Sequence, residues 1–381
     1  MKPVYKIDKK GKTRVWSVVV DGDTYTVSSG IKDGNLINSV TKCVGKNIGK
    51  KNETSPAEQA LKEATAKRTK QINRQGYTED LETYEKPFSV QLCSNYAKTP
   101  AKCIKNATPL MFEQNKLDGL KGYFKDGKMM SRKDVHYEKV HPSLIAKCQR
   151  FHDHLVKAHG MKNPVIDGEL FINNTFWLED LNSIIKGGET LTGNDKAGHK
   201  FYDMGPEHVD FHVCNVWDET IKDTNYEHVI PFVAEAATFG LNYCHSFPVT
   251  FDVLEQSLNK AIESGDEGLV IYMNVPYKAG KTNNCWKYKR MQDAEWRIVG
   301  TKETKTITEK DGTKVKQFQH VCETKSGVTF AVRMEGTNAH RETIGSGKFV
   351  GKLLKIRYQG LYKTGRPQFG VGVTVRLEDD I

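Results

Sequence analysis

Three lysines have the side-chain type and spacing suited to chemistry on a phosphate group. Lys116 begins the sequence KLDG, and Lys287 and Lys289 lie two residues apart within WKYK. A free lysine has a pKa near 10.4 and must lose a proton before it can act as a nucleophile. Cations at Lys287 and Lys289, together with a bound metal ion, are expected to lower the pKa of Lys116 and to offset charge on the phosphates. These residues therefore predict attack of the Lys116 amine on a nucleoside triphosphate.

Two glutamates and one tryptophan supply further parts of such a site. Glu169 lies in the sequence IDGELF, and Glu267 lies in DEGLVI. Carboxylate oxygens are the ligands that Mg²⁺ prefers, so we expect Glu169 and Glu267 to hold the ribose and a Mg²⁺ ion. Trp217 ends a β-like run, where its indole is able to stack on a purine. Taken singly, each of these clusters also fits an exposed turn or a solvated edge strand.

Strands are expected to position these side chains. The β-like run 109–114 precedes Lys116, so strand geometry would put Gln114 and Lys116 on one side. The same period of two puts both lysines of WKYK on one face and both aromatic residues on the other. Between about residues 87 and 292, short β-like runs alternate with helical segments. From about residue 294 the pattern is all-β and suggests a small closed barrel, with an OB-fold as the first candidate. Its expected strands are 297–299, 318–322, 328–332, 353–358 and 369–375.

The N-terminal residues are expected to form a separate small domain that ends near residue 85. Residues 15–27 alternate around a turn at Gly22, which predicts a β-hairpin. The sequence SPAE at residues 55–58 is a capping box that opens a helix ending at Gly76. Residues 1–76 contain 16 Lys and Arg against 7 Asp and Glu, most of the net charge of +10 of the whole chain. This excess favours a polyanionic partner, although a basic surface kept for solubility would show it too.

The cysteines, apolar runs and histidines of the chain argue against several classes of protein. The eight cysteines lie far apart without a C-x-x-C pair, which argues against a zinc ribbon or disulfide framework and fits a reducing cytosol. No run approaches the roughly 18 apolar residues of a membrane helix, and no signal-like apolar stretch follows the first residues. We therefore expect a cytoplasmic protein without a membrane partner. His152 and His154 do not share a helix face, so we expect a solvated surface there rather than a metal site.

The order of these motifs resembles that of the ATP-dependent DNA ligases of the covalent nucleotidyltransferase superfamily, particularly the compact viral and bacteriophage kind. The motifs are K-x-D-G, S-R, D-G-E-L, W-D, E-G-L-V-I and K-x-K followed by D-A-E, and the match covers residues 109–381. The resemblance implies an α+β fold, with an adenylation (nucleotidyltransferase) domain of antiparallel sheets flanked by helices at 86–292 and an OB-fold domain at 293–381. It also implies nicked duplex DNA as substrate, ATP and Mg²⁺ as cofactors, and a monomer. The implied roles are DNA repair, replication and recombination, in the host cytoplasm if the protein is viral.

The resemblance also implies three chemical steps and a role for each site residue. Lys116 would become bonded to AMP, the AMP would pass to the 5′-phosphate of a nick, and the 3′-hydroxyl would displace it to seal the strand. The implied contacts are Gln114 with the adenine edge, Arg132 with the ribose or the nick phosphate, Glu169 with the ribose hydroxyl, Trp217 with the adenine face, Glu267 with the metal, and Lys287 and Lys289 with the α-phosphate.

Two features depart from the family's pattern. Lys121 stands five residues after Lys116, where these ligases usually have arginine. Lysine keeps the charge but lacks the planar fork that grips ribose and phosphate together. The family's last basic motif, which orients pyrophosphate, is only partly present. Arg366 and Arg376 are both candidates for orienting pyrophosphate or binding DNA, with Arg376 slightly ahead.

Residues 1–85 resemble a WGR domain, a module of nuclear poly(ADP-ribose) polymerases that touches DNA near a strand break. The resemblance rests on the sequence VWSVVVDG, a glycine-rich stretch, SPAEQALKEA and the closing pair Gly76-Tyr77. The name-giving Trp-Gly-Arg is absent, since the chain reads SSGIK around Gly30. The implied role of this domain is to grip DNA.

Three other functions remain open at this point. An RNA or RNA/DNA-hybrid ligase is the nearest relative, but those enzymes usually lack the aspartate of K-x-D-G, so Asp118 favours DNA. An mRNA-capping guanylyltransferase shares the lysine nucleophile and the OB lid, whereas D-A-E after K-x-K and Gln114 before Lys116 favour a ligase. A non-enzymatic protein with a basic module and an OB barrel would bind nucleic acid by charge and stacking alone.

Overall fold

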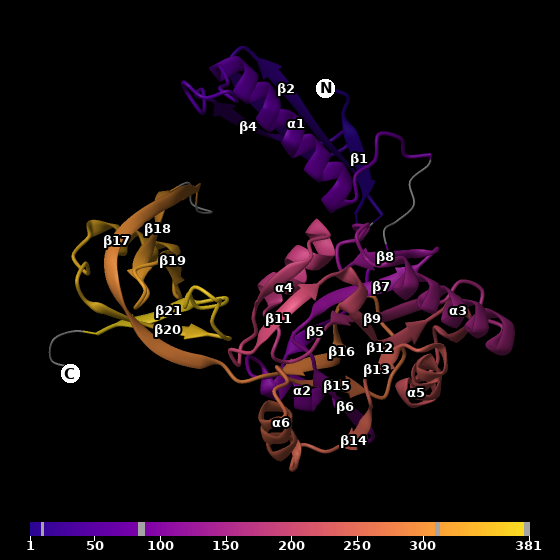
Figure 1. Cartoon of the computed structure of the whole chain (residues 1–381). Coiled ribbons are helices and arrows are strands. Elements are labelled where there is room, and N and C mark those ends of the chain that lie inside the picture. The colour runs from indigo at the N-terminus through magenta and orange to yellow at the C-terminus, as the bar shows by residue number, and fades with distance from the viewer. Residues whose placement is uncertain (9–10, 83–87, 309–312, 377–381) are drawn as a thin grey trace.

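The computed structural model describes residues 1–381 except 9–10, 83–87, 309–312 and 377–381. Figure 1 shows an N-terminal domain, a central domain and a C-terminal barrel, with the barrel to one side of the central domain. The expected boundary between residues 85 and 86 lies outside the described residues. The expected boundary at 292/293 falls at the start of the first barrel strand, which begins at Gln292.

The N-terminal domain is an antiparallel meander covered on one face by a helix. Its strands pair in chain order: β1 (Val4–Ile7), β2 (Thr13–Asp21), β3 (Thr24–Ile31) and β4 (Leu36–Lys42). Helix α1 (Pro56–Gln75) begins at the predicted capping box and ends at Gly76, whose φ of 68° is the left-handed C-cap conformation. The predicted hairpin is also confirmed, with Gly22 at φ 54° in its turn. The buried core lies between sheet and helix and contains Val4, Trp16, Val18, Tyr25, Ala60, Ala64 and Tyr77.

The central domain contains two five-stranded sheets. The first has the order β14 (Phe247–Val249), β6 (Met111–Lys116), β15 (Gly268–Met273), β16 (Gly280–Tyr288) and β5 (Gln91–Asn95). The second has the order β13 (Asn242–Tyr243), β12 (Asp210–Trp217), β9 (Val165–Phe171), β7 (Leu120–Lys125) and β8 (Lys128–Ser131). Most neighbouring strands are antiparallel, and β5 and β13 join the sheets as parallel edge strands.

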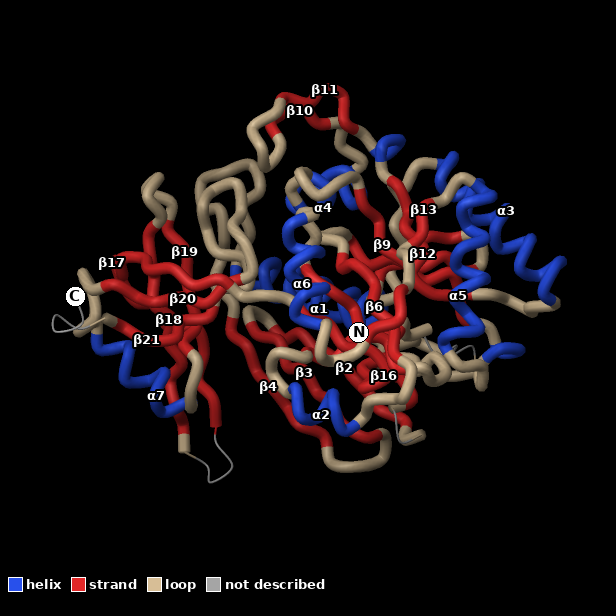
Figure 2. The backbone as a smooth tube through the Cα atoms, turned by 90° about the horizontal axis from the view of Figure 1, so that it is seen from below, coloured by secondary structure: helices blue, strands red, loops and turns tan. Residues whose placement is uncertain are grey.

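Helices and a hairpin surround these sheets. The helices are α2 (Pro100–Lys105), α3 (Pro142–His159), α4 (Leu178–Asn182), α5 (Tyr226–Ala234) and α6 (Leu254–Glu263), with the short turns η1 (Ser183–Gly187), η2 (Pro206–His208), η3 (Glu219–Ile221) and η4 (Glu235–Phe239). The largest core cluster joins α3 and α5 to the second sheet through Phe151, Leu155, Phe211 and Val233. The separate hairpin of β10 (Leu191–Asn194) and β11 (Lys200–Met204) projects from the central domain, as Figure 2 shows.

The C-terminal domain is a five-stranded barrel with an OB-like arrangement. Its strands are β17 (Gln292–Thr308), β18 (Lys314–Glu323), β19 (Thr329–Met334), β20 (Leu353–Tyr358) and β21 (Val371–Val375), and they close in the order β17-β18-β19-β21-β20. Helix α7 (Asn338–Thr343) and the turn η5 (Ile344–Ser346) lie between β19 and β20. All five predicted strands are present, but β17 is much longer than predicted because it pairs with β20 at one end and with β18 at the other.

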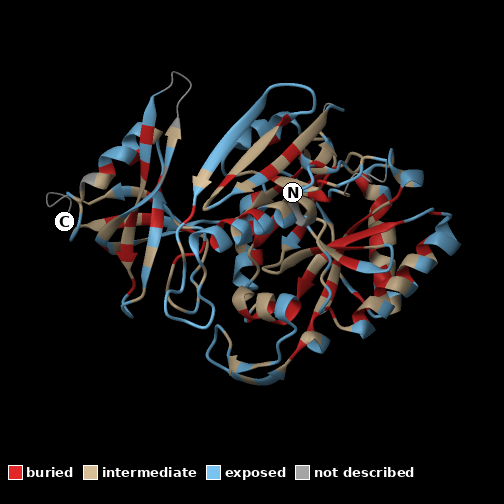
Figure 3. Ribbon diagram, turned by 90° about the horizontal axis from the view of Figure 1, so that it is seen from above, coloured by how far each residue is buried: buried red, intermediate tan, exposed pale blue. Residues whose placement is uncertain are grey.

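Each of the three domains has its own cluster of buried hydrophobic residues. Figure 3 shows buried residues concentrated in the central domain, while pale exposed surface covers much of the N-terminal sheet and helix. None of the helices in the described ranges has the length and apolar character needed to cross a membrane.

Candidate active site

Two glycines allow the strands that carry Lys116 and Glu267 to meet their neighbours. A Cβ on Gly119 would lie 2.5 Å from the carbonyl oxygen of Leu170, which shows that the backbone passes close to β9 at this point. Gly268 lies opposite Lys116 in the β6–β15 pair and has a φ of +148°. Its absent Cβ would lie 2.3 Å from the carbonyl oxygen of Tyr288. Only glycine fits this position, and the resulting path brings the Glu267 amide to the Lys116 carbonyl oxygen at 2.8 Å.

Lys116 and Lys289 share one carboxylate. The Lys116 ammonium forms an ion pair with Glu267 Oε2, and Lys289 Nζ lies 2.5 Å from Glu267 Oε1. The Lys116 side chain is 23% exposed, so it is partly covered but reachable. Lys289 directly follows β16, which ends at Tyr288. Trp286 is buried in the core and Tyr288 packs against it, and this packing fixes the orientation of the strand end that carries Lys289. Burying a large apolar side chain contributes roughly 1.5–3 kcal/mol, which fixes this orientation.

In the protein without ligands, nearby carboxylates have the larger effect on the pKa of Lys116. Burial by itself would lower the pKa of Lys116, but the charges of Glu267 and Glu169 raise it above its usual value. Without a bound metal ion this pKa is therefore raised, and its expected lowering by Lys287, Lys289 and a metal ion together stays a prediction. Burial lowers the pKa of Lys289, and the charges of Lys116 and Lys287 lower it further, while Glu267 opposes the shift.

Lys121 and Asp167 form a second ion pair beside Glu169. The β7–β9 register puts Lys121 opposite Glu169, and Lys121 Nζ lies 2.7 Å from Asp167 Oδ1. Burial alone would lower the pKa of Lys121, but Asp167 holds it well above the usual range. Burial raises the pKa of Glu169 to about 7, although Lys121 and Lys116 oppose the shift. The charges of Glu169 and Glu267 both act on Lys116, and carboxylate oxygens are the ligands that Mg²⁺ prefers, so these two acids fit the predicted metal ion, whose binding stays a prediction.

Replacement of Lys121 by arginine is expected to maintain or raise the rate of self-adenylylation. A guanidinium keeps the charge opposite Glu169 and is able to hold Asp167 through two hydrogen bonds. The rate of covalent labelling by radiolabelled ATP measures the effect, and Lys125→Arg on the same strand is the matched control. A large loss in Lys121→Arg alone would show that the pocket is built around a lysine.

Gln114 is buried inside the central domain, although it lies two residues before Lys116 on the same strand. Its side chain is 2% exposed, and its amide nitrogen donates to Tyr226 Oη at 2.8 Å and to Ser246 Oγ and the Cys214 carbonyl oxygen, each at 3.0 Å. Both amide hydrogens therefore have acceptors within the protein. A contact of Gln114 with an adenine edge stays a prediction. The hydrogen bonds named above involve its amide nitrogen and not its amide carbonyl oxygen.

Trp217 ends β12 as predicted and lies in an aromatic cluster. Its ring centroid is 5.3 Å from that of Phe88 and 6.5 Å from that of Tyr277. The Tyr277 hydroxyl donates to Asp167 at 3.3 Å, which links this cluster to the Lys121 ion pair. The structure thus connects Trp217 to the site through Tyr277 and Asp167, and the stacking of Trp217 on adenine stays a prediction.

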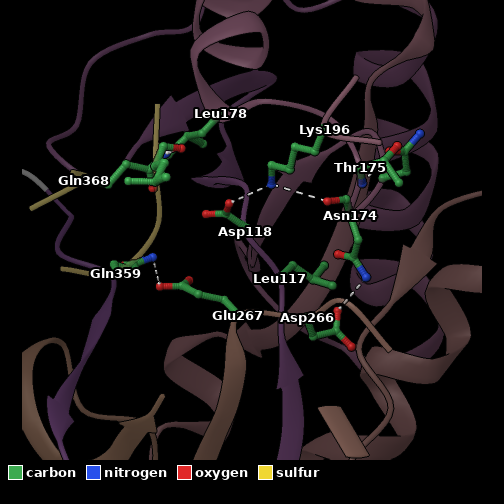
Figure 4. Close-up of polar contacts among 12 residues, drawn as sticks. Leu117, Asp118, Asn174, Thr175, Leu178, Lys196, Asp266, Glu267, Gln359 and Gln368 are labelled. Atoms are coloured by element: carbon green, nitrogen blue, oxygen red, sulfur yellow. Dashed lines mark hydrogen bonds and ion pairs between the residues drawn. The ribbon is translucent and has the colours of Figure 1, made fainter. Parts of the chain in front are cut away.

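Residues from the barrel and from the β10–β11 hairpin also reach the site, and sequence reasoning missed them. The Gln359 amide donates to Glu267 Oε1 and accepts from Lys289, as Figure 4 shows for the first of these contacts. Lys196, in the hairpin turn, lies 3.2 Å from Asp118 Oδ2. Neither residue lies in one of the sequence motifs. Each reaches the site through packing between segments that are distant in sequence, so no local pattern marks it.

The three predicted arginines lie in different surroundings. Arg132 follows β8 and is exposed, and its charge opposes the rise in the pKa of Tyr137 that burial and Glu169 cause. Arg376 pairs with Glu295 on the barrel at 2.7 Å. Arg366 lies over the ring of Tyr362 at 5.5 Å, in the segment between β20 and β21 that reaches the central domain. Neither contact decides between the two arginines, so the role of Arg366 or Arg376 at pyrophosphate or DNA stays a prediction. The residues that follow Arg376 in its proposed motif lie outside the described ranges.

Comparison with solved structures relates the chain to DNA ligases in fold. A structure from a study of Lig E DNA ligases that bind DNA with a minimal scaffold aligns with a TM-score of 0.52 at 20% identity, covering 76% of this chain and 99% of that one. Two structures titled Pmar-Lig, forms PreS3 and Pre, align with a TM-score of 0.57 at 17% identity and cover 84% and 85% of this chain and 72% of theirs. No protein-family model matches the sequence, and a comparison with curated proteins finds no match. At these identities the likeness shows that the chain has the fold of a Lig E DNA ligase.

Proposed function

We propose that this protein is an ATP-dependent polynucleotide ligase that seals nicks with a 5′-phosphate and a 3′-hydroxyl in duplex DNA. The observation that carries the proposal is the grouping of Lys116, Lys289 and Glu267 at one end of the first sheet, with Glu169 and Lys121 beside it. The fold shared with a Lig E DNA ligase supports the same class of enzyme.

The first step would be transfer of AMP from ATP to Lys116. The Lys116 amine attacks the α-phosphorus, a nitrogen–phosphorus bond forms, the bond to pyrophosphate breaks, and the amine proton leaves. A Mg²⁺ ion held by Glu169 and Glu267 would supply positive charge for the phosphates. With those carboxylates occupied, the two acids that keep the pKa of Lys116 high would no longer do so. The positive charges of Lys287 and Lys289 would then lower the pKa of the amine and stabilise the negative charge on the α-phosphate.

The next two steps would move AMP onto the nick and release it. The 5′-phosphate oxygen attacks the phosphorus of lysyl-AMP, which frees Lys116 and leaves AMP joined to the DNA end. The 3′-hydroxyl then attacks the 5′-phosphorus, a phosphodiester forms, and AMP leaves. The barrel contributes Gln359 at Glu267, and Lys363 Nζ lies 2.5 Å from Asp180 Oδ1 of the central domain. These contacts support a barrel that closes over the nucleotide site.

The N-terminal domain is proposed to add to the grip on DNA. It carries most of the net charge, and its sequence resembles a WGR domain. Deletion of residues 1–85 is expected to weaken binding to nicked duplex, because fewer lysines then displace counterions from phosphates. The slope of log affinity against log salt should become shallower by about 0.9 for each phosphate that the shortened protein no longer neutralises.

Fluorescence anisotropy with a labelled nicked duplex at several salt concentrations measures both effects of this deletion. The domain has its own core, so the central domain and barrel keep theirs. An alanine pair at Lys50 and Lys51, in an exposed turn, is a milder variant that should change the salt slope in the same direction. An unchanged affinity and slope in the deletion would remove this role.

The proposed function is tested by sealing of a labelled, 5′-phosphorylated DNA nick with ATP and Mg²⁺. Sealed product is expected with ATP, and none is expected with GTP or with a 5′-hydroxyl nick. A nick in which one strand is RNA tests the RNA-ligase alternative in the same assay. Covalent labelling from GTP alone would indicate a guanylyltransferase, and the absence of labelling by either nucleotide would indicate a protein that only binds nucleic acid.

A further inference from the structure

Two histidines and a glutamate converge on the side of the central domain opposite the barrel. His154 and His159 lie in the last turns of α3, and Glu235 begins η4 directly after α5. Figures 1 and 2 both show α3 and α5 on the side facing away from the barrel. The Nε2 atoms of His154 and His159 each lie 2.8 Å from Glu235 Oε2, and all three possible ligand atoms lie within 4.8 Å of one another. This group is separate from the Lys116 site.

Neighbouring aromatic rings hold the two imidazoles in place. The His154 ring lies 5.0 Å from Phe239, and the His159 ring lies 4.8 Å from Phe232. The two imidazoles meet edge to face at 5.6 Å. The side chains are 35% and 26% exposed, so their outer edges remain open to an ion from solvent. The group is therefore positioned by packing and still accessible.

The donor set and its spacing suit Zn²⁺. Two imidazole nitrogens and one carboxylate oxygen are ligands that Zn²⁺ binds, with a fourth position left for water. Ligand atoms about 2 Å from a tetrahedral ion lie about 3.3 Å apart. The present histidine-to-glutamate distances of 2.8 Å would need to open by only about half an ångström. The Glu235 side chain is 33% exposed, so a change of its rotamer would be the smallest adjustment that admits the ion.

We propose that His154, His159 and Glu235 form a Zn²⁺ site that links the C-terminal end of α3 to the segment after α5. His152 takes no part, because its ring nitrogens face Asp153 and Asn163 instead. The sequence analysis expected no metal site at His152 and His154, because they do not share a helix face. The partners of His154 are instead His159 and Glu235, and Glu235 is distant in sequence and becomes a neighbour only when α5 packs beside α3. The bound ion would brace this side of the domain.

The test uses the full chain after removal of metal and a titration with Zn²⁺ against a chromophoric chelator. The wild type and the matched control His152→Asn are expected to bind one Zn²⁺ at this site, while Glu235→Gln and His159→Asn lose at least about tenfold in affinity. Co²⁺ should give the visible absorption of a tetrahedral site in the first two proteins only. Equal Zn²⁺ binding in all four proteins, or no binding in the wild type, would overturn the proposal.

Thermal unfolding gives a second readout that does not depend on activity. Zn²⁺ should raise the unfolding midpoint of the wild type and of His152→Asn by a few degrees, because the three proposed ligands come together only in the folded chain. The rise should be absent in Glu235→Gln, whose midpoint without metal shows whether that variant folds. Self-adenylylation at Lys116 should be unchanged in Glu235→Gln, so failure of the Zn²⁺ site and failure of the ligase proposal give different results. A Zn²⁺-dependent rise that persists in Glu235→Gln would contradict the site.

Discussion

Replacement of Lys116 by alanine is expected to abolish covalent labelling by ATP and to reduce nick sealing by at least about 10³-fold. Lys116 is the partly covered amine paired with Glu267, and alanine leaves no nitrogen to bond to the α-phosphorus. Removal of the nucleophile itself costs more than removal of a group that only stabilises the transition state, because no neighbouring side chain occupies the same point. Radiolabelled ATP followed by denaturing electrophoresis measures the label, and a nicked duplex measures sealing.

Two comparisons make this result specific. Lys125→Ala, on strand β7, removes a lysine that pairs with the exposed Asp126 and should leave labelling unchanged. A nick that already carries AMP on its 5′-phosphate should still be sealed by Lys116→Ala, because that step needs no lysyl-AMP. Labelling of Lys116→Ala at the wild-type rate would show that the nucleophile lies elsewhere.

Replacement of Glu267 by glutamine is expected to lower the rate of self-adenylylation by about 10²-fold, the usual effect of removing one polar group that stabilises charge in a transition state. The variant removes the carboxylate shared by Lys116 and Lys289 and one of the two proposed Mg²⁺ ligands. A second effect has the opposite sign. Because Glu267 raises the pKa of Lys116, its loss should make the amine easier to deprotonate.

The rate as a function of pH separates these two effects of the Glu267 variant. The plateau should fall because Mg²⁺ and phosphate binding weaken. The rising limb of kcat/KM, which reports the protein before ATP and Mg²⁺ bind, should move to lower pH. Higher Mg²⁺ concentration should restore part of the plateau. Glu255→Gln is the matched control, since Glu255 also pairs with a cation, Arg290, but lies on the surface of α6. An unchanged plateau and an unchanged limb would mean that Glu267 does not act on Lys116 during the reaction.

Local sequence signals predicted several helices and strands of the fold. The capping box at Ser55 and the glycine at 76 marked both ends of α1, because these are interactions between residues close in sequence. The alternation in WKYK predicted that Trp286 and Tyr288 share a face, and both contribute to one core cluster, Trp286 as a buried member and Tyr288 as a partly buried neighbour. The order of short strands after residue 294 likewise indicated the barrel, since each strand and turn carries its own pattern.

Effects that depend on the tertiary structure were beyond the reach of the sequence. The sign of the pKa shift of Lys116 depends on whether acids or cations lie nearer to the amine, and motif order does not contain those distances. Gln114 reads as a ligand contact in sequence but is buried against Tyr226. Gln359 and Lys196 approach the site only after the barrel and the β10–β11 hairpin have packed. A pattern of residue types cannot report contacts between segments with no fixed spacing.

The most direct test of the account is to identify the residue that carries AMP. The chain is incubated with ATP and Mg²⁺, digested under conditions that preserve a nitrogen–phosphorus bond, and examined by tandem mass spectrometry. One added AMP is expected on the peptide that contains Lys116, and it should be released when pyrophosphate or nicked DNA is supplied. AMP found on Lys287, Lys289 or any other residue, or no adduct in a chain that still seals nicks, would contradict it.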